Sequence, residues 1–405
     1  MSTMIANSAP RGVRYQIALI GRRNAGKSSL FNLLTGQDIA IVSDTAGTTT
    51  DAISKPYELL PLGPVTFYDT AGLDDEGELG LQRIKASLKI LYRADICLLV
   101  TDEQGLTAKE LQLIEELQQL KIPFLIIFNK ADISDIKNKD IDYCQQHQLA
   151  YLAASSTLNM GADQIKQAIY EIAPAELKQE QVLASDLYQA GETVLCVVPI
   201  DMSAPKGRLI LPQVQVLREA LDHDAMAIVV KESQLAQALA QLNTPPAIVI
   251  ADSQVIKQVT QVVPENVPLT TFSTLFARFK GDLAILAQGA DALDNLQDGD
   301  KIMMAEACSH HSQEDDIGRV KLPNMIKHYS QKQLTFDIKA GHDFPDNLAD
   351  YALVVHCGSC MLNRTEMIRR VRECERRNIP VTNYGVAISK IQGVLPRVMQ
   401  PFIGK

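Results

Sequence analysis

The sequence lacks any apolar run of about 18 residues, the length that a membrane span needs. Its first 16 residues also lack the apolar core of a signal peptide. Basic residues are outnumbered: 39 Lys and Arg stand against 48 Asp and Glu, giving a net charge of −9. The chain as a whole therefore lacks the positive charge of a nucleic-acid-binding protein. We expect a cytoplasmic protein that binds neither membranes nor nucleic acid.

The seven cysteines are an odd number in a long chain without a secretory signal, which argues against a disulfide framework. Four of them have ordinary settings in apolar strands or helical stretches and are weak ligand candidates: Cys97, Cys144, Cys196 and Cys374. The other three stand close to histidines: Cys308, Cys357 and Cys360.

The composition is that of a globular protein, with 46% hydrophobic and 21% charged residues. At about 100–200 residues per domain, 405 residues predict about three domains. Short apolar runs alternate with amphipathic stretches, which predicts an α/β fold with mainly parallel sheets. A polar stretch, AELKQEQ, and a proline-containing one, VVPENVPL, separate the three predicted domains: 1–175, 180–268 and 269–405.

The apolar runs give the strands that we expect. In the first domain they are 15–21, 65–69, 96–102, 124–130 and 151–155. The middle domain has strands at 194–200, 226–231 and 247–251, and it contains no cluster of catalytic residue types. The last domain begins with a helix-like stretch at 272–289 and continues with strands at 301–307, 334–338, 351–357 and 380–383.

A phosphate-binding loop follows the first expected strand. The sequence from Gly21 to Ser28 reads G-x-x-x-x-G-K-S and leads into a helical stretch. Backbone N–H groups of such a loop face phosphate oxygens, Lys27 neutralises the β- and γ-phosphates, and Ser28 offers a hydroxyl to Mg²⁺. Taken alone, the motif could also be a glycine-containing turn before a helix. Further motifs in the right order remove that alternative.

Two such motifs end later strands. D-T-A-G follows the strand at 65–69, where Asp69 can reach Mg²⁺ through water and the N–H of Gly72 can reach the γ-phosphate. N-K-A-D follows the strand at 124–128 and resembles the guanine-reading motif of GTPases. Its Asp132 can accept hydrogen bonds from guanine N1 and the exocyclic amine, which adenine cannot supply. The nucleotide-contacting residues that we expect are Gly21, Asn24, Ala25, Gly26, Lys27, Ser28 and Ser29, with Asn129, Lys130, Asp132, Ser155 and Ser156 around the base.

The stretch S-D-T-A-G-T-T-T-D at 43–51 resembles the G-T-T-x-D switch of bacterial P-loop GTPases of the Era and tRNA-modification type. The resemblance implies that Thr49 closes over Mg²⁺ and that Asn24 holds a K⁺ ion in place of an arginine finger. Arg23 stands where the group often has proline. Leu73 cannot orient the attacking water, so we expect slow, Mg²⁺-dependent and K⁺-stimulated hydrolysis, with the water-positioning residue unassigned.

Two cysteine and histidine clusters follow strands of the last domain: C-x-H at Cys308 and His310, and H-C-x-x-C at 356–360. The carboxyl ends of strands are where α/β folds place their sites. Three thiolates suit a 4Fe-4S cluster with one open iron. A core thiol cluster, a redox pair and a structural zinc site of three cysteines and one histidine are the alternatives. The predicted iron ligands are Cys308, Cys357 and Cys360, with Glu306, His310 and His356 as candidates for a fourth ligand or a supporting donor.

These GTPase motifs, the plain middle domain and the C-x-H and H-C-x-x-C motifs together resemble the family of FeFe-hydrogenase maturation GTPases (HydF). The resemblance implies a scaffold that holds a 4Fe-4S cluster and delivers a di-iron precursor to apo FeFe-hydrogenase. It also implies two radical-SAM maturases as partners and a homodimer formed by the middle domain.

The main alternative is an RNA-directed GTPase, acting in tRNA modification or ribosome assembly, with a structural zinc site. Such a protein needs an RNA-binding surface. The best candidate is a C-terminal helix with five arginines: Arg369, Arg370, Arg372, Arg376 and Arg377. Glutamates interleave with them, which is typical of a solvated helix face.

Overall fold

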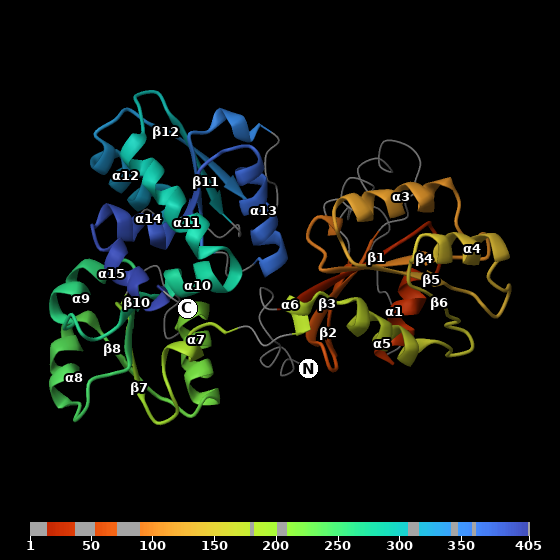
Figure 1. Cartoon of the computed structure of the whole chain (residues 1–405), viewed down its shortest axis with the longest axis horizontal. Coiled ribbons are helices and arrows are strands. Elements are labelled where there is room, and N and C mark those ends of the chain that lie inside the picture. The colour runs from red at the N-terminus through yellow and green to blue at the C-terminus, as the bar shows by residue number, and fades with distance from the viewer. Residues whose placement is uncertain are drawn as a thin grey trace, which may run out of the picture. The chain divides into compact units, whose positions relative to one another are not determined.

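The computed structural model describes residues 14–36, 53–70, 90–178, 182–200, 209–306, 316–341, 347–358 and 362–403. They belong to two compact units, Met1–Glu180 and Gln181–Lys405 (Figure 1). None of the helices in these ranges is long and apolar enough to span a membrane.

The first unit is built on a six-stranded sheet with the strand order β2-β3-β1-β4-β5-β6. Its strands are β1 (Tyr15–Ile20), β2 (Ile53–Leu59), β3 (Gly63–Asp69), β4 (Ile96–Thr101), β5 (Phe124–Phe128) and β6 (Tyr151–Ala153). Only β2 pairs antiparallel, with β3. The described helices are α1 (Lys27–Thr35), α3 (Ala108–Gln119), α4 (Asn138–Gln146), α5 (Ala162–Ile172) and α6 (Ala175–Lys178).

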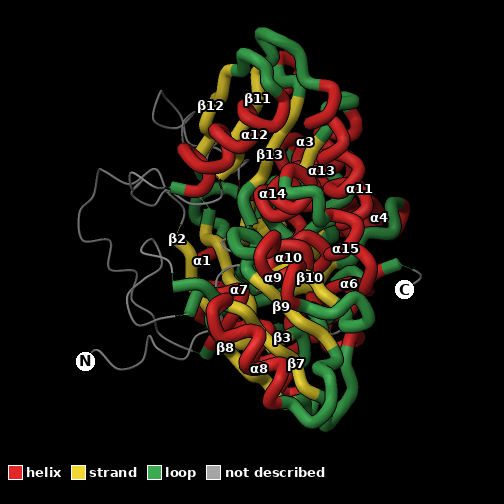
Figure 2. The backbone as a smooth tube through the Cα atoms, turned by 90° about the vertical axis from the view of Figure 1, so that its left-hand side faces the viewer, coloured by secondary structure: helices red, strands yellow, loops and turns green. Residues whose placement is uncertain are grey.

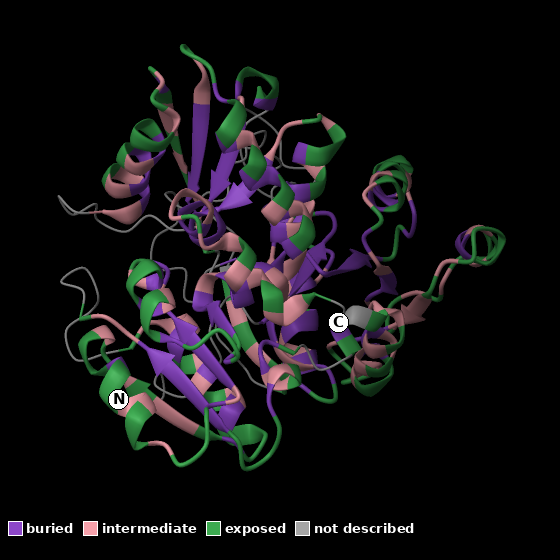
Figure 3. Cartoon of the chain, turned by 60° about the vertical axis from the view of Figure 1, so that its left-hand side comes forward, coloured by how far each residue is buried: buried purple, intermediate pink, exposed green. Residues whose placement is uncertain are grey.

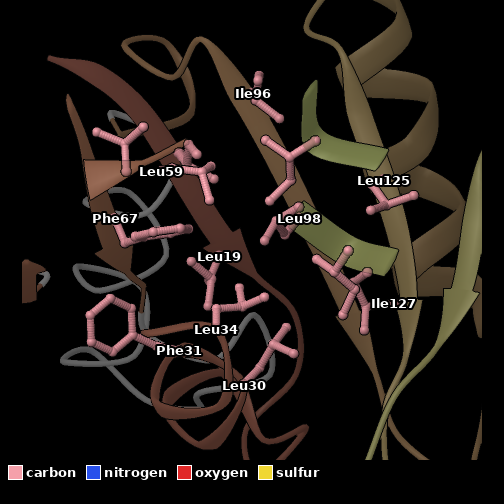
Figure 4. Packing of buried hydrophobic residues seen from close by; sticks show 14 of the residues in the cluster. Leu19, Leu30, Phe31, Leu34, Leu59, Phe67, Ile96, Leu98, Leu125 and Ile127 are labelled. Carbon is pink, nitrogen blue, oxygen red and sulfur yellow. The ribbon is translucent and has the colours of Figure 1, made fainter. Parts of the chain in front are cut away.

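Strand alternation divides the apolar residues of this sheet between two cores. On one face, Leu19, Leu98 and Ile127 pack with Leu30 and Leu34 of α1, as Figure 4 shows. On the other face, alternate residues of β1, β4 and β5 pack against α3 and α4. Both faces are covered, as parallel sheets require, and the carboxyl edge of the strands is left for the loops.

The second unit contains two four-stranded sheets in which all strands are parallel. The first has the order β10-β9-β7-β8 and consists of β7 (Thr193–Val197), β8 (Met226–Val230), β9 (Ile248–Ala251) and β10 (Leu269–Thr271). Its helices are α7 (Leu211–Asp222), α8 (Leu235–Gln241) and α9 (Ile256–Val262). In Figure 2 helices flank the strands of these parallel sheets.

The second sheet of this unit has the order β12-β11-β13-β14, with β11 (Lys301–Glu306), β12 (Thr335–Ala340), β13 (Leu353–His356) and β14 (Val381–Asn383). The helices that follow or cover it are α10 (Phe272–Lys280), α11 (Leu283–Gly289), α12 (Leu322–Ser330), α13 (Arg364–Arg376), α14 (Tyr384–Ile391) and α15 (Leu395–Met399). A π-helical turn, η5 (Ile317–Lys321), precedes α12. The inner strands of this sheet are buried, whereas the helices carry exposed outer faces (Figure 3).

The predicted α/β class with mainly parallel sheets is confirmed, and every expected strand is present. Two strands were not expected. The short β10 precedes α10 directly, and β2 contains Pro56, which an edge strand tolerates. The helix-like stretch at 272–289 is two helices, because Gly281 is extended and the Asp282 side chain caps α11 by accepting from the N–H of Ile285. Both later predicted domains lie within the second unit, and the division into three stays a prediction.

Candidate functional site

The phosphate loop leaves β1 at a place where only glycine fits. A Cβ atom at Gly21 would lie 2.1 Å from the carbonyl oxygen of Val100 on the neighbouring β4. Gly26 has a φ of 90° at the N-cap of α1, and a Cβ there would lie 2.2 Å from the side-chain nitrogen of Asn129. Asn24 is also left-handed, with a φ of 61°. The two glycines therefore let the loop pack directly against β4 and the N-K-A-D segment.

Lys27 and Ser28 occupy the positions that phosphate chemistry needs. The buried ammonium of Lys27 donates to the carbonyl oxygens of Gly21, at 3.0 Å, and Arg22, at 2.8 Å. The Ser28 hydroxyl donates to the Asp69 carboxylate at the end of β3. Two oxygen donors of this kind side by side fit Mg²⁺, which prefers hydroxyl and carboxylate oxygens. Thr49 and Gly72 lie outside the described residues.

The predicted base-reading residues connect to the phosphate loop through Asn129. Its buried side-chain amide donates to the carbonyl oxygen of Ala25 at 2.9 Å. Ser155 donates to Asp132 at 2.5 Å, which fixes that carboxylate. Lys130 forms an ion pair with Glu103 at 3.1 Å. The buried Ser156 hydroxyl has no hydrogen-bond partner in the part of the chain that the structure describes.

Arg22, inside the phosphate loop, is a site residue that sequence reasoning missed. Its buried guanidinium donates to Asp102 beyond β4, at 2.8 Å, and to Glu110 of α3, at 2.7 Å. It also donates to the carbonyl oxygen of Gly105 and to Gln104. The two carboxylates are 80 and 88 positions away in the sequence, so no local sequence pattern predicts that Arg22 binds them. Arg22 thereby ties the phosphate loop to the loop after β4.

In the second unit, three neighbouring strands bring polar side chains to one edge of the sheet. Strand pairing places His356 opposite Ala305 of β11 on one side and Asn383 of β14 on the other. The residues that end or follow these strands are Glu306, Cys357 and Tyr384. Side chains alternate along each strand, and these three share the face of Met304 and Val355, with Tyr384 and Cys357 belonging to the same core. His356 points to the opposite face.

Glu306 is buried and its carboxylate is held by one arginine. Arg319 of η5 donates from Nε to both carboxylate oxygens at 3.2 Å and from Nη2 at 2.7 Å. The hydrogen bond to Glu306 raises the pKa of Arg319. Arg319 therefore fixes this carboxylate and balances its charge.

His356 uses both ring nitrogens on the other face of the sheet. Its Nε2 lies 3.0 Å from Nη1 of Arg370 and its Nδ1 lies 3.1 Å from the carbonyl oxygen of Cys357. Because a guanidinium only donates, Nε2 accepts and Nδ1 carries the proton. Burial, and then the charge of Arg370, lower the pKa of His356 to about 3. Arg370 also donates to Glu366 at 2.7 Å, so His356 is part of a buried chain of polar groups leading into α13.

Tyr384 is the second residue that the sequence did not reveal. Its hydroxyl is buried and has no hydrogen-bond partner among the described residues. Burial raises the pKa of Tyr384, and the charges of Cys357, Glu306 and Asp316 raise it further. Tyr384 and Cys357 follow the adjacent strands β14 and β13 and belong to the same core. A thiol, a carboxylate and an unpartnered donor at one strand edge fit a group that needs a thiolate ligand and carries acceptor atoms, as an iron–sulfur cluster does.

The remaining predicted ligands, Cys308, His310 and Cys360, lie outside the described residues. Among the side chains that the structure describes, no three of the metal-ligating types come together. Cys97, Cys144, Cys196 and Cys374 are buried in apolar cores, so none of the four faces this edge.

Comparison with protein families assigns the described units. Residues 16–130 match the family described as 50S ribosome-binding GTPase. Residues 183–281 match the Hydrogen maturase F dimerization domain, and residues 284–401 match the Hydrogen maturase F tetramerization domain. The first unit is thus a GTPase domain, and the second carries two domains that go with assembly of several chains.

Curated GTPases match part of the chain. GTPase Der of Nitratidesulfovibrio vulgaris is 36% identical over 155 residues, which are 35% of this chain and 31% of that protein. The tRNA modification GTPase MnmE of Legionella pneumophila is 37% identical over 172 residues, 42% of this chain and 36% of that protein. The chain spans about a third of the length of these relatives. A crystal structure of Era from Aquifex aeolicus is 19% identical with a TM-score of 0.35, covering 53% of this chain and 92% of that one.

Proposed function

This chain belongs to the hydrogen maturase F family, and on that premise we propose that it is a GTP-hydrolysing scaffold for FeFe-hydrogenase maturation. It holds a 4Fe-4S cluster and delivers a di-iron precursor to apo FeFe-hydrogenase, with two radical-SAM maturases as its other partners in the cytoplasm. The observation that carries the proposal is the union, in one chain, of a GTPase domain with both assembly domains of this family.

The nucleotide site supports hydrolysis of GTP with Mg²⁺. The buried ammonium of Lys27 in the phosphate loop is suited to balance the charge of the β- and γ-phosphates, and the contact between Ser28 and Asp69 brings together two oxygens suited to Mg²⁺. Asp132, held by Ser155, is the group that accepts from guanine. Asn24 has a left-handed backbone in the loop. We assign it as the residue that would hold K⁺, and the ion would supply positive charge during phosphoryl transfer.

For the cluster, we assign the three thiolates of Cys308, Cys357 and Cys360 to three irons. Glu306 supports this assignment, because it lies on the same sheet face as Cys357 and is fixed by Arg319. We give His356 a positioning role: its Nδ1–H holds the carbonyl oxygen of Cys357, and its Nε2 is taken by Arg370. Glu306 and His310 then remain as candidates for the weak fourth ligand.

The sheet edge at β8 supports self-association into a homodimer. β8 is the outermost strand in the order β10-β9-β7-β8, so one side of its backbone is left to pair with another strand. Its side chains are apolar yet exposed, with Met226 at 56% and Val229 at 42%. Two copies joined through β8 would bury these side chains and continue the sheet.

The arginine-rich helix does not support the RNA-directed alternative. Glu373 of α13 accepts from both Arg376 and Arg377, and the buried Arg370 binds Glu366. These three arginines are paired with glutamates of their own helix, which lowers the positive charge that α13 offers to a phosphate backbone.

The test is to purify the full chain without oxygen and to measure iron, acid-labile sulfide and zinc per chain. The proposal expects about four irons and four sulfides, which are lost in Cys357→Ala. It further expects that the loaded protein activates apo FeFe-hydrogenase after incubation with the products of the two maturases. A colourless protein with one zinc per chain and no activation of apo-hydrogenase would contradict it and favour a zinc-stabilised GTPase.

A further inference from the structure

Tyr384 follows β14 directly and begins α14, next to the strand that ends in Cys357. The side chain is 9% exposed, and its hydroxyl oxygen is inaccessible. A buried tyrosine hydroxyl normally finds a hydrogen-bond partner, because burial without one is costly. This hydroxyl has none among the described residues. The Tyr384 hydroxyl is therefore a buried donor that can bind an acceptor from outside the described residues.

The surroundings of the hydroxyl show which acceptor it suits. Arg319 engages the nearby Glu306 carboxylate, so that carboxylate is already paired. The Asp316 carboxylate, whose charge also acts on Tyr384, accepts from the N–H groups of Gly318 and Arg319. The Cys357 thiol at this edge is only partly buried. An acceptor with thiolate affinity, bound at Cys357, would therefore lie beside the phenol.

Gly318 leaves room for the phenol. A Cβ atom at this position of η5 would lie 2.3 Å from the Tyr384 hydroxyl and 2.6 Å from its ring. The backbone of η5 therefore packs closely against the hydroxyl end of the ring, and a side chain at this position would displace the phenol. Packing against η5 therefore fixes the position of the hydroxyl, although no described group forms a hydrogen bond with it.

We propose that Tyr384 is a positioning residue of the cluster site, whose hydroxyl donates a hydrogen bond to a sulfur atom of the iron–sulfur group bound at Cys357. This inference rests on the proposed function. A phenol is protonated at neutral pH and can donate. A donor aimed at a thiolate or sulfide stabilises the reduced cluster, which is more negative, and so raises its reduction potential.

The experiment compares Tyr384→Phe with Tyr351→Phe in the full chain, each purified without oxygen and reconstituted with iron and sulfide. Tyr351 is a matched control: it is buried in the same unit, but its hydroxyl already donates to Asp337 at 2.6 Å. Iron and sulfide are counted, the reduction potential is measured by a redox titration followed by electron spin resonance, and the melting temperature of the metal-free protein is recorded.

We expect Tyr384→Phe to bind a full cluster whose potential is more negative than in the parent, with altered g-values. Its metal-free form should melt at the same temperature or higher, because an unpaired buried group has been removed. Tyr351→Phe should melt lower and keep the parental potential. An unchanged potential and unchanged g-values in Tyr384→Phe, with a normal cluster in the parent, would overturn the role of Tyr384 alone.

A parent chain that takes up no iron and sulfide under these conditions would overturn the proposed function and this inference together. A second variant guards against an effect of ring packing alone. Gly318→Ala keeps the hydroxyl but pushes it from its position, so it should also shift the potential downward. A downward shift in Tyr384→Phe without one in Gly318→Ala would contradict the requirement for a fixed hydroxyl.

Discussion

Replacing Arg22 by alanine should destabilise the GTPase domain locally and weaken nucleotide binding. The side chain is buried and ties two carboxylates, Asp102 and Glu110, which are themselves buried. Removing one partner of a buried ion pair leaves uncompensated charge and costs about 3–5 kcal/mol. At 1.36 kcal/mol per factor of ten, that corresponds to a change of roughly 100- to 5,000-fold in a local opening equilibrium.

Hydrogen exchange of the full chain measures this effect without assuming that a protein of several domains unfolds in one step. Amides of β1 and β4 should exchange about 100- to 5,000-fold faster in Arg22→Ala, up to the limit set by opening of the whole domain. GTP binding should weaken as well, because Lys27 donates to the carbonyl oxygen of Arg22 itself. Arg22→Lys, which keeps the charge but not the fork of donors, should recover part of the loss.

The matched control is Arg218→Ala. Arg218 also binds a carboxylate, Asp222, at 2.6 Å, but its side chain is 74% exposed. An exposed pair of this kind is screened by water and contributes little to stability. The reasoning fails if exchange in β1 and β4 is no faster in Arg22→Ala than in Arg218→Ala, because the buried ion pairs would then contribute no more than a surface pair.

Three further outcomes follow from the site and the sheet edge. Lys27→Ala should lower GTP hydrolysis at least about 100-fold, measured as phosphate release, since it removes a charge that acts on the transferred phosphate. Asp132→Asn should weaken GTP binding about 10- to 150-fold, because one charged hydrogen bond is lost. In a competition assay, the weak binding of ATP should be unaffected. Equal use of ATP and GTP by the parent would refute the base assignment. Val229→Lys should convert dimers to monomers in light scattering, whereas Val214→Lys, at a valine of α7 that is 46% exposed, should not.

The strands and the nucleotide motifs could be predicted because their signals are local. Apolar runs such as ICLLV at β4 are short and nearly continuous, as buried parallel strands are. The phosphate loop is specified by consecutive residues, from Gly21 to Ser28. The sequence did not predict β2, because its apolar residues are sparse and Pro56 interrupts them. A single helix was expected at 272–289 since its periodicity runs through Gly281, where the backbone leaves the helix.

Arg22 and Tyr384 could not be predicted because their importance depends on partners far away in the sequence. In the sequence, Arg22 resembles an ordinary loop arginine. Only the fold brings two carboxylates to it, from α3 and from the loop after β4. In the sequence, Tyr384 resembles an ordinary apolar helix residue. Only the pairing of β13 with β14 brings it to the same core as Cys357. Both depend on the order of strands in a sheet, and periodicity along the chain does not specify that order.

The same sheet explains why residue type alone is a poor guide to which groups can face the proposed cluster. His356 and Cys357 are neighbours in the chain, and both are good metal ligands by chemistry. Because side chains alternate along a strand, the imidazole turns to α13, where Arg370 occupies one nitrogen and the Cys357 carbonyl oxygen the other. A histidine bound in this way fixes the backbone at Cys357. Position within the strand thus turns the two neighbours to opposite faces, which is why we propose Cys357 as a cluster ligand and His356 as a positioning residue.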